Sequence, residues 1–147
     1  MVNKTFKVAE IELAYKPNYK TADKPKIKDS NGACQILIDH WDQNKIGLLE
    51  EFKILLMNRG NRVLGVVHIS SGGMGGTVAD PKLIFAAALK SCANGIILSH
   101  NHPSGETQPS QEDITITRKL KHGGKLLDIQ ILDHIIIGHE EFYSFSD

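Results

Sequence analysis

A short apolar run, Gly95-Ile-Ile-Leu-Ser-His100, constrains the fold more than any other segment of this chain. Its apolar residues follow one another without the alternation that a half-exposed strand shows. Such a run is typical of a strand that is buried on both faces of its sheet. Together with the order of strands and helices that local patterns predict, it indicates an α/β sandwich in which a mixed β-sheet is flanked by helices.

Local patterns predict the other elements. Arg59-Gly-Asn lies between two strand-like runs and is typical of a tight hairpin. Ser30, Asp80 and Ser110 are each suited to cap a helix, and Gly123-Gly124 is suited to end one. The expected strands cover 5–15, 51–58, 62–70, 95–100 and 129–137, and the expected helices cover 30–41, 81–94 and 110–122.

Composition limits the class of protein. A chain of 147 residues has one domain's length, and its formal net charge of zero offers no bulk attraction to nucleic acid or to a membrane surface. Residues 1–49 are expected to form a strand, a lysine-rich connector and a helix packed on a core domain of 50–147. No stretch has the pattern of a signal peptide or a membrane span, so the cytoplasm is the expected location. Of the two cysteines, Cys92 lies in an apolar helical pattern and is predicted to be buried.

Two segments have open interpretations. The run Lys16–Lys28 contains five lysines and two prolines. It is interpreted as a solvated connector, and the alternative is a basic arm that contacts nucleic acid. The glycine-rich segment Ser71–Thr77 lacks the Gly-Lys-Ser/Thr ending of a phosphate-binding loop, so it is interpreted as a connector or a lid.

The residues after the apolar strand carry the chemistry. His100 and His102 are two positions apart at the strand's end, so both imidazoles point to the same side. Asp113 falls in the first turn of the next helix, where the chain returns toward that strand end. Two imidazoles and one carboxylate form a suitable zinc set that leaves the fourth tetrahedral position for water.

Each half of this pattern also has a plainer explanation. A lone His-x-His at a strand end is weak support for a metal. Ser110-x-x-Asp113 resembles a capping box, which would serve helix initiation alone. The two motifs in this order form a more specific pattern than either motif alone.

This order, His-x-His-Pro, six residues, then Ser-x-x-Asp, resembles the JAMM metalloprotease signature of the JAB/MPN fold. The wording HNHPSGETQPSQEDITITRKLK, with the later LLDIQILDHIIIG, resembles the bacterial RadC family in particular. The likeness runs from about Glu50 to the end of the chain. It implies a JAB/MPN-like, cytidine-deaminase-like layered fold and a bound Zn²⁺ with His100, His102 and Asp113 as ligands.

The resemblance also implies the catalytic roles. The family pattern has a glutamate two positions before an aromatic residue at the hairpin's first strand, which selects Glu50 over Glu51, with Glu10 and Glu12 as lesser rivals. Zinc would lower the pKa of its water toward roughly 7. Glu50 would then act as the general base through that water, and the Ser110 hydroxyl would help to stabilise the oxyanion.

Two functions from different classes follow. The first is a zinc-dependent hydrolase that acts on a peptide or isopeptide substrate. The second is a DNA-repair-associated or protein-binding module that keeps the zinc fold with little or no catalysis; residues 1–49 show no helix-hairpin-helix pattern of the kind that RadC proteins commonly carry. A zinc deaminase is disfavoured because no Pro-Cys-x-x-Cys pair is present. Asp133 and His134 are expected to be a satisfied core pair or to support the ligands.

Overall fold

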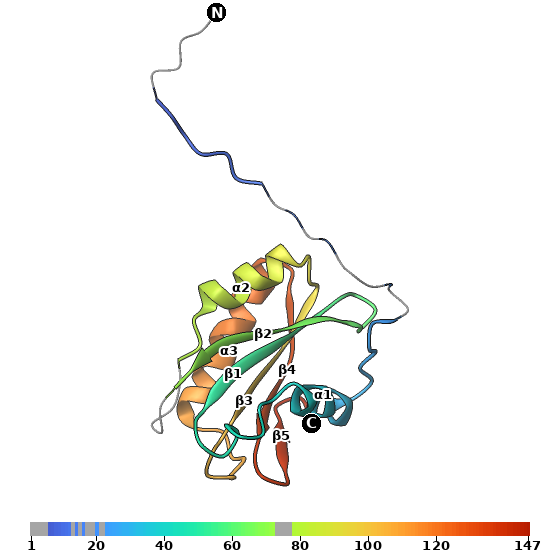
Figure 1. The fold of residues 1–147 in the computed structure, drawn as a ribbon, viewed down its shortest axis with the longest axis vertical. Helices are drawn as coiled ribbons and strands as arrows, with labels where there is room; N and C mark the ends of the chain where they lie inside the picture. Colours follow the sequence, from blue (N-terminus) through green and yellow to red (C-terminus); the bar gives the residue numbers. More distant parts are fainter. Residues whose placement is uncertain (1–5, 13, 15, 17–19, 21–22, 73–77) are drawn as a thin grey trace, which may run out of the picture.

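The structure is a computed structural model that describes residues 6–12, 14, 16, 20, 23–72 and 78–147. Its strands form one five-stranded sheet in the order β2-β1-β3-β4-β5 (Figure 1). The strands are β1 (Glu51–Met57), β2 (Val63–Ser71), β3 (Gly95–Asn101), β4 (Gln130–Ile137) and β5 (Phe142–Ser144). Only the pairing of β3 with β4 is parallel, so the sheet is mixed as predicted.

Strand β3 is the most enclosed strand of the sheet. It pairs with β1 on one edge and with β4 on the other, and all seven of its residues are buried. A strand covered on both faces gains free energy from every apolar side chain, which explains the lack of alternation in 95–100. The interpretation of this run as a doubly buried strand is confirmed.

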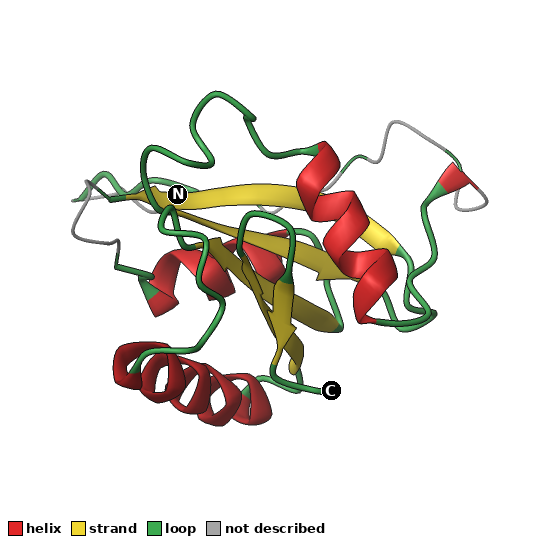
Figure 2. Ribbon diagram, turned by 90° about the horizontal axis from the view of Figure 1, so that it is seen from below, coloured by secondary structure: helices red, strands yellow, loops and turns green. Residues whose placement is uncertain are grey.

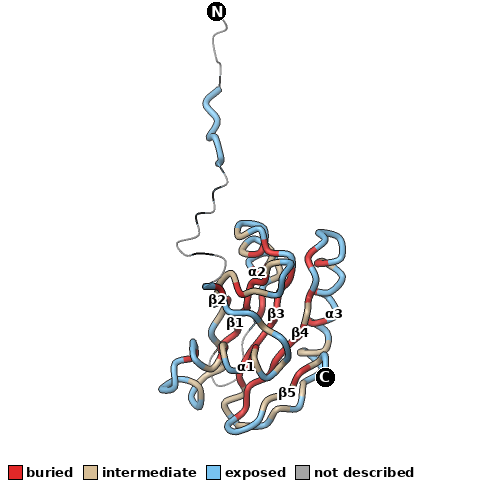
Figure 3. Tube along the Cα trace, turned by 90° about the vertical axis from the view of Figure 1, so that its right-hand side faces the viewer, coloured by how far each residue is buried: buried red, intermediate tan, exposed pale blue. Residues whose placement is uncertain are grey.

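Helices cover both faces of the sheet (Figure 2). Helices α2 (Pro81–Lys90) and α3 (Gln111–Leu126) pack on one face, where Ile84 and Leu120 contact the apolar side chains of β1 and β3. Helix α1 (Ser30–Asp39) packs on the opposite face through Leu37. Figure 3 shows β3 and β4 as largely buried, whereas the helices carry many exposed residues. This arrangement confirms the predicted α/β sandwich.

The helix starts agree with the capping signals in two of three cases. Asp80 caps α2 and Ser110 caps α3, each by accepting a backbone N–H. Helix α1 is capped by Asp29 instead of Ser30, because the Asp29 carboxylate accepts the N–H of Gly32 at 2.8 Å. Helix α2 also ends at Lys90, earlier than the predicted Asn94-Gly95.

Helix α3 runs through Gly123 and Gly124, so the prediction that these glycines end it is wrong. The left-handed residue after the helix is Asp128, with φ of 56°. The two glycines instead permit close approach: a Cβ at Gly123 would lie 2.9 Å from the Phe85 ring, and one at Gly124 would strike the carbonyl oxygen of Ile129. Close packing, and not the end of the helix, therefore requires glycine at these two positions.

We predict that Gly124→Ala destabilises the protein by about 1–3 kcal/mol, although alanine ordinarily favours a helix, because the new Cβ meets backbone that cannot move aside. Urea denaturation measures this change in the free energy of unfolding. Gly47→Ala is the matched control, since a Cβ there meets nothing within 4 Å. Equal stability of the two variants would contradict the packing explanation.

The amino-terminal strand expected over 5–15 is not formed in its described part. Residues 6–12 are exposed and have no strand hydrogen bonds. Their loose apolar alternation is not enough, because a strand forms only when its backbone pairs with another strand. The end of the lysine-rich connector, by contrast, is held on the hairpin: Val63 N–H donates to the Pro25 carbonyl and Ile27 N–H to that of Asn61. That part of the connector is therefore not purely solvated.

The prediction that Cys92 is buried is wrong. Cys92 is exposed, since α2 ends before it, whereas Cys34 lies on the buried face of α1. Burial raises the pKa of the Cys34 thiol to about 11, so this thiol stays protonated at neutral pH. The lid expected at 71–77 falls mostly on residues outside the described ones. Among the described residues, none of the helices is long and apolar enough to cross a membrane.

Candidate metal centre

The two histidines of the His-x-His motif lie side by side at the end of β3. His100 is within the strand, between Phe52 of β1 and Ile136 of β4. His102 follows the strand, and its backbone N–H still donates to the Ile137 carbonyl at 3.0 Å. Their Nε2 atoms are 3.0 Å apart, and the Nδ1 of His102 lies 2.9 Å from the Glu106 carbonyl oxygen. The strand end therefore aims both rings at one point.

Asp113 is delivered to the same point by the start of α3. The capping box is complete, because Ser110 Oγ accepts the Asp113 N–H at 3.1 Å and Asp113 Oδ2 accepts the Ser110 N–H at 2.8 Å. The carboxylate oxygens also lie 3.2 Å from His100 Nε2 and 3.4 Å from His102 Nε2. The capping and ligand interpretations of this residue are thus compatible in one conformation.

The spacing of these three groups can be compared with that of a zinc site. Tetrahedral zinc with bonds of about 2.0–2.1 Å places its ligand atoms roughly 3.3 Å apart. The two Nε2 atoms are 3.0 Å apart, His100 Nε2 lies 3.2 Å from Asp113 Oδ1, and His102 Nε2 lies 3.4 Å from Asp113 Oδ2. The two imidazoles and the carboxylate therefore have a spacing that suits the ligands of a tetrahedral ion.

The contacts within the cluster shift the pKa values of Asp113 and His102. Burial works to raise the pKa of Asp113, but the close imidazoles of His100 and His102 outweigh it and hold that pKa well below its usual range. The hydrogen bond to Asp113 raises the pKa of His102 against the opposing effect of burial. Asp113 is consequently a carboxylate at neutral pH, as a metal ligand must be.

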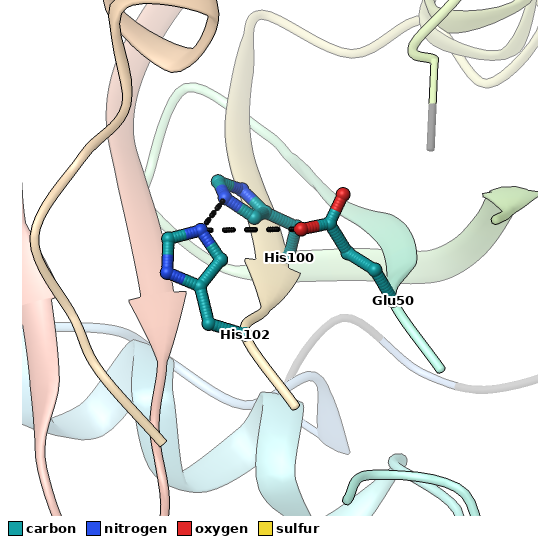
Figure 4. A group of neighbouring side chains, drawn as sticks. All are labelled: Glu50, His100 and His102. Atoms are coloured by element: carbon teal, nitrogen blue, oxygen red, sulfur yellow. Dashed lines mark hydrogen bonds and ion pairs between the residues drawn. The ribbon is translucent and has the colours of Figure 1, made fainter. Parts of the chain in front are cut away.

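Glu50 lies beside this cluster, immediately before β1. Figure 4 shows its carboxylate directed toward the two imidazoles, with Oε1 3.9 Å from His102 Nε2. Glu50, His100 and His102 form a group whose ligand atoms lie within 4.8 Å of one another and which could hold a metal ion. Glu51 points away and lies near His68, with 3.5 Å between the carboxylate and the ring, as the alternation of a strand requires.

Asn101 is a site residue that sequence reasoning missed. It lies between the two histidines, points to the other side of the strand, and is fully buried. Its side-chain oxygen accepts the Glu51 N–H at 2.7 Å, and its amide donates to the carbonyls of Ile46 at 2.7 Å and Leu49 at 3.0 Å. Asn101 thereby holds the segment that carries Glu50 against the strand that carries the histidines. A polar residue in a doubly buried strand was the available signal.

We predict that Asn101→Ala destabilises the protein by about 2–4 kcal/mol, because a buried N–H and two carbonyls lose their partner. The change is measured as the free energy of unfolding in urea. Asn44→Ala, an exposed position in the same connecting segment, should change it by less than about 0.5 kcal/mol. Similar values for the two variants would show that Asn101 does not hold the segment.

Asp133 and His134 do not form a side-chain pair with each other. The Asp133 carboxylate accepts the Ser144 hydroxyl at 2.6 Å and the backbone N–H of Ser146 at 3.1 Å. His134 points to the opposite face of the sheet, where its Nε2 lies 2.8 Å from His100 Nδ1. His134, and not Asp133, is therefore the residue that contacts a candidate ligand.

A cleft of 270 Å³ opens beside the cluster. Glu50, Phe52, His100 and Asp113 line it, together with Val78, Ala79, Glu112 and Ile116. A larger hollow of 630 Å³ lies near the far ends of β3 and α3, around Gly95 and Lys125, and includes none of the cluster residues. The smaller cleft is the one where chemistry at the cluster can reach a bound molecule.

The sequence profile of the RadC-like JAB domain matches residues 27–147. The chain belongs to the RadC-like JAB domain family. A UPF0758 protein of Flavobacterium johnsoniae is 43% identical over 143 residues, which cover 95% of this chain and 60% of that protein. A UPF0758 protein of Alkaliphilus metalliredigens is 45% identical over 122 residues, covering 83% of this chain and 51% of that protein.

The chain thus spans about half to 60% of the length of these relatives. Their shared name, UPF0758 protein, specifies no reaction. The family membership confirms the resemblance inferred from the His-x-His-Pro and Ser-x-x-Asp motifs and agrees with the JAB/MPN-like sheet flanked by helices.

Proposed function

We propose that this chain is a zinc-dependent hydrolase of the metallopeptidase or isopeptidase type. The observation that carries the proposal is the triangle of His100, His102 and Asp113, whose ligand atoms lie 3.0–3.4 Å apart, with the Glu50 carboxylate beside it. Two imidazoles and a carboxylate are a preferred donor set of catalytic zinc. Asp113 lies closer to the histidines than Glu50 does, so we assign Asp113 as the ligand and Glu50 to proton transfer.

Zinc bound by these three residues would supply an acidified water and a Lewis acid that polarises the scissile carbonyl. Glu50 takes the proton of the attacking water and returns it to the leaving amine. The Ser110 hydroxyl is exposed, and its oxygen already accepts the Asp113 N–H, so its own proton remains available to a developing oxyanion. His100, His102 and Asp113 act as ligands, and Glu50 and Ser110 as catalytic residues.

The substrate we propose is a peptide or isopeptide. The cleft beside the cluster combines the acidic Glu50 and Glu112 with the apolar Phe52 and Ile116, which suits an amide group next to an apolar side chain. A volume of 270 Å³ has room for a small part of a peptide only. Cleavage would therefore act on an extended or flexible segment.

We predict that Glu50→Gln lowers peptide hydrolysis by about 10²–10⁴-fold while zinc content stays at the wild-type level, because glutamine cannot accept the proton. Turnover is measured with a peptide library, and zinc by elemental analysis. Glu51→Gln is the matched control and should retain activity, since its carboxylate is directed toward His68 instead of the cluster. Full activity in the Glu50 variant would exclude it as the base.

We further predict that His102→Ala loses zinc together with activity, because one of three protein ligands is removed. His40→Ala, which removes an exposed histidine on the far side of the sheet, should retain both. Normal zinc content in the His102 variant would refute the ligand assignment.

The alternative, a DNA-associated module, makes a different prediction. Salt-sensitive DNA binding would then depend on the connector lysines Lys20, Lys24, Lys26 and Lys28. Of these, Lys24 is buried against the hairpin, so it is poorly placed to contact a phosphate. Loss of DNA binding on neutralising the other three, with no chelator-sensitive cleavage, would favour this alternative over hydrolysis.

A further inference from the structure

A chain of buried polar groups runs behind His100, on the side away from the proposed zinc. His100 Nδ1 lies 2.8 Å from His134 Nε2, and His134 Nδ1 lies 2.6 Å from Thr117 Oγ1. Thr117 Oγ1 in turn donates to the backbone carbonyl of Asp113 at 2.6 Å. The three side chains are each at most 3% exposed, so water does not compete for these contacts.

The number of protons available in this row of polar groups determines the direction of each hydrogen bond. A carbonyl oxygen only accepts, so the single hydroxyl proton of Thr117 lies toward Asp113. His134 Nδ1 must then be the donor to Thr117 Oγ1. A neutral His134 with its proton on Nδ1 presents a lone pair at Nε2, and His100 Nδ1 donates to it. His134 is fully buried, and its two ring nitrogens contact a histidine and a threonine instead of a carboxylate, which favours the neutral ring.

From this geometry we propose that His134 and Thr117 are positioning residues that hold His100 in the tautomer whose Nε2 lone pair faces the metal. The inference rests on the proposed zinc site. A ligating histidine commonly donates its second N–H to a carboxylate or a backbone carbonyl. In this chain a second histidine takes that place, and its own proton is directed by a threonine on the helix that supplies the third ligand.

The opposite arrangement has a specific cost. If His100 carried its proton on Nε2, toward Asp113 Oδ1 at 3.2 Å, then His134 Nε2 would have to donate to His100 Nδ1. A neutral His134 would then accept from Thr117, and the Asp113 carbonyl would face Thr117 Oγ1 at 2.6 Å without a proton between them. Two oxygens at that distance repel each other.

Aromatic packing holds the row of His100, His134 and Thr117, which we call the relay, in place in the absence of an ion. The His134 ring stacks on Phe145, with centroids 5.0 Å apart and 15° between the planes, and it meets Phe52 edge-on at 5.6 Å. His100 in turn lies parallel to Phe52 at 5.9 Å. The rings therefore have little freedom to rotate away from their hydrogen bonds, and the relay connects the ligand on β3 to the ligand on α3 by way of β4.

The test combines two readouts on the full chain. Nitrogen-15 NMR of the metal-free protein, recorded well above the ordinary pKa of histidine, reports which ring nitrogen of His100 and of His134 carries the proton. Zinc affinity is measured by competition with a chelator. We expect both rings to be protonated on Nδ1 in the wild type.

Thr117→Val removes the hydroxyl at nearly constant volume, and Thr115→Val is its exposed control on the same helix. We expect Thr117→Val to mix the His100 tautomers and to weaken zinc binding by about 10–100-fold, with no change in Thr115→Val. His134→Leu should weaken zinc binding at least as much. His134→Gln should recover much of the affinity, since an amide can accept from His100 and donate to Thr117.

A His100 proton on Nε2 in the metal-free wild type would overturn the proposal, and this readout does not require any variant to fold. Zinc affinity in Thr117→Val equal to that of Thr115→Val, with both variants folded by circular dichroism, would overturn it as well. Failure of the wild type to bind zinc would instead refute the proposed function, and the tautomer measurement separates the two cases because it is made without metal.

Discussion

The burial of β3 is the constraint on which the rest of the structure depends. Because β3 pairs on both edges and is covered on both faces, hydrogen bonds and packing fix the position of its backbone and of the residues at its end. His100 is held between the flanking strands, His102 is tied to β4 by its backbone, and Asn101 secures the segment before β1. A cluster on a firmly held strand end keeps the geometry that metal binding needs.

Asp113 connects this strand to the helical layer. One carboxylate closes the capping box of α3 and faces both imidazoles. The start of the helix and the geometry of the cluster are therefore coupled: displacing the helix start would move the third candidate ligand. The row of buried hydrogen bonds behind His100 ends at the backbone carbonyl of Asp113. The start of α3 at Asp113 therefore links the position of β3 to the geometry of the cluster.

Much of the fold was predictable because its signals are local. The hairpin, the doubly buried strand, and the caps at Asp80 and Ser110 follow from residue type and spacing over a few positions. The errors arise where packing decides. Gly123 and Gly124 were interpreted as a helix stop, but they admit Phe85 and the Ile129 carbonyl. The strand expected near the amino terminus has no pairing in its described residues, and Cys92 lies beyond its helix and is exposed.

The sequence by itself determined which residues are candidates for the site. His100, His102, Asp113, Ser110 and Glu50 were all identifiable, because strand alternation, a helix cap and a family motif are properties of neighbouring positions. Only the tertiary structure decided how they meet. Asn101, Thr117 and His134 act across 50, 17 and 34 positions of the chain, respectively, through hydrogen bonds between different elements. No local pattern specifies such contacts, since they exist only once the sheet has brought β1, β3 and β4 together against α3.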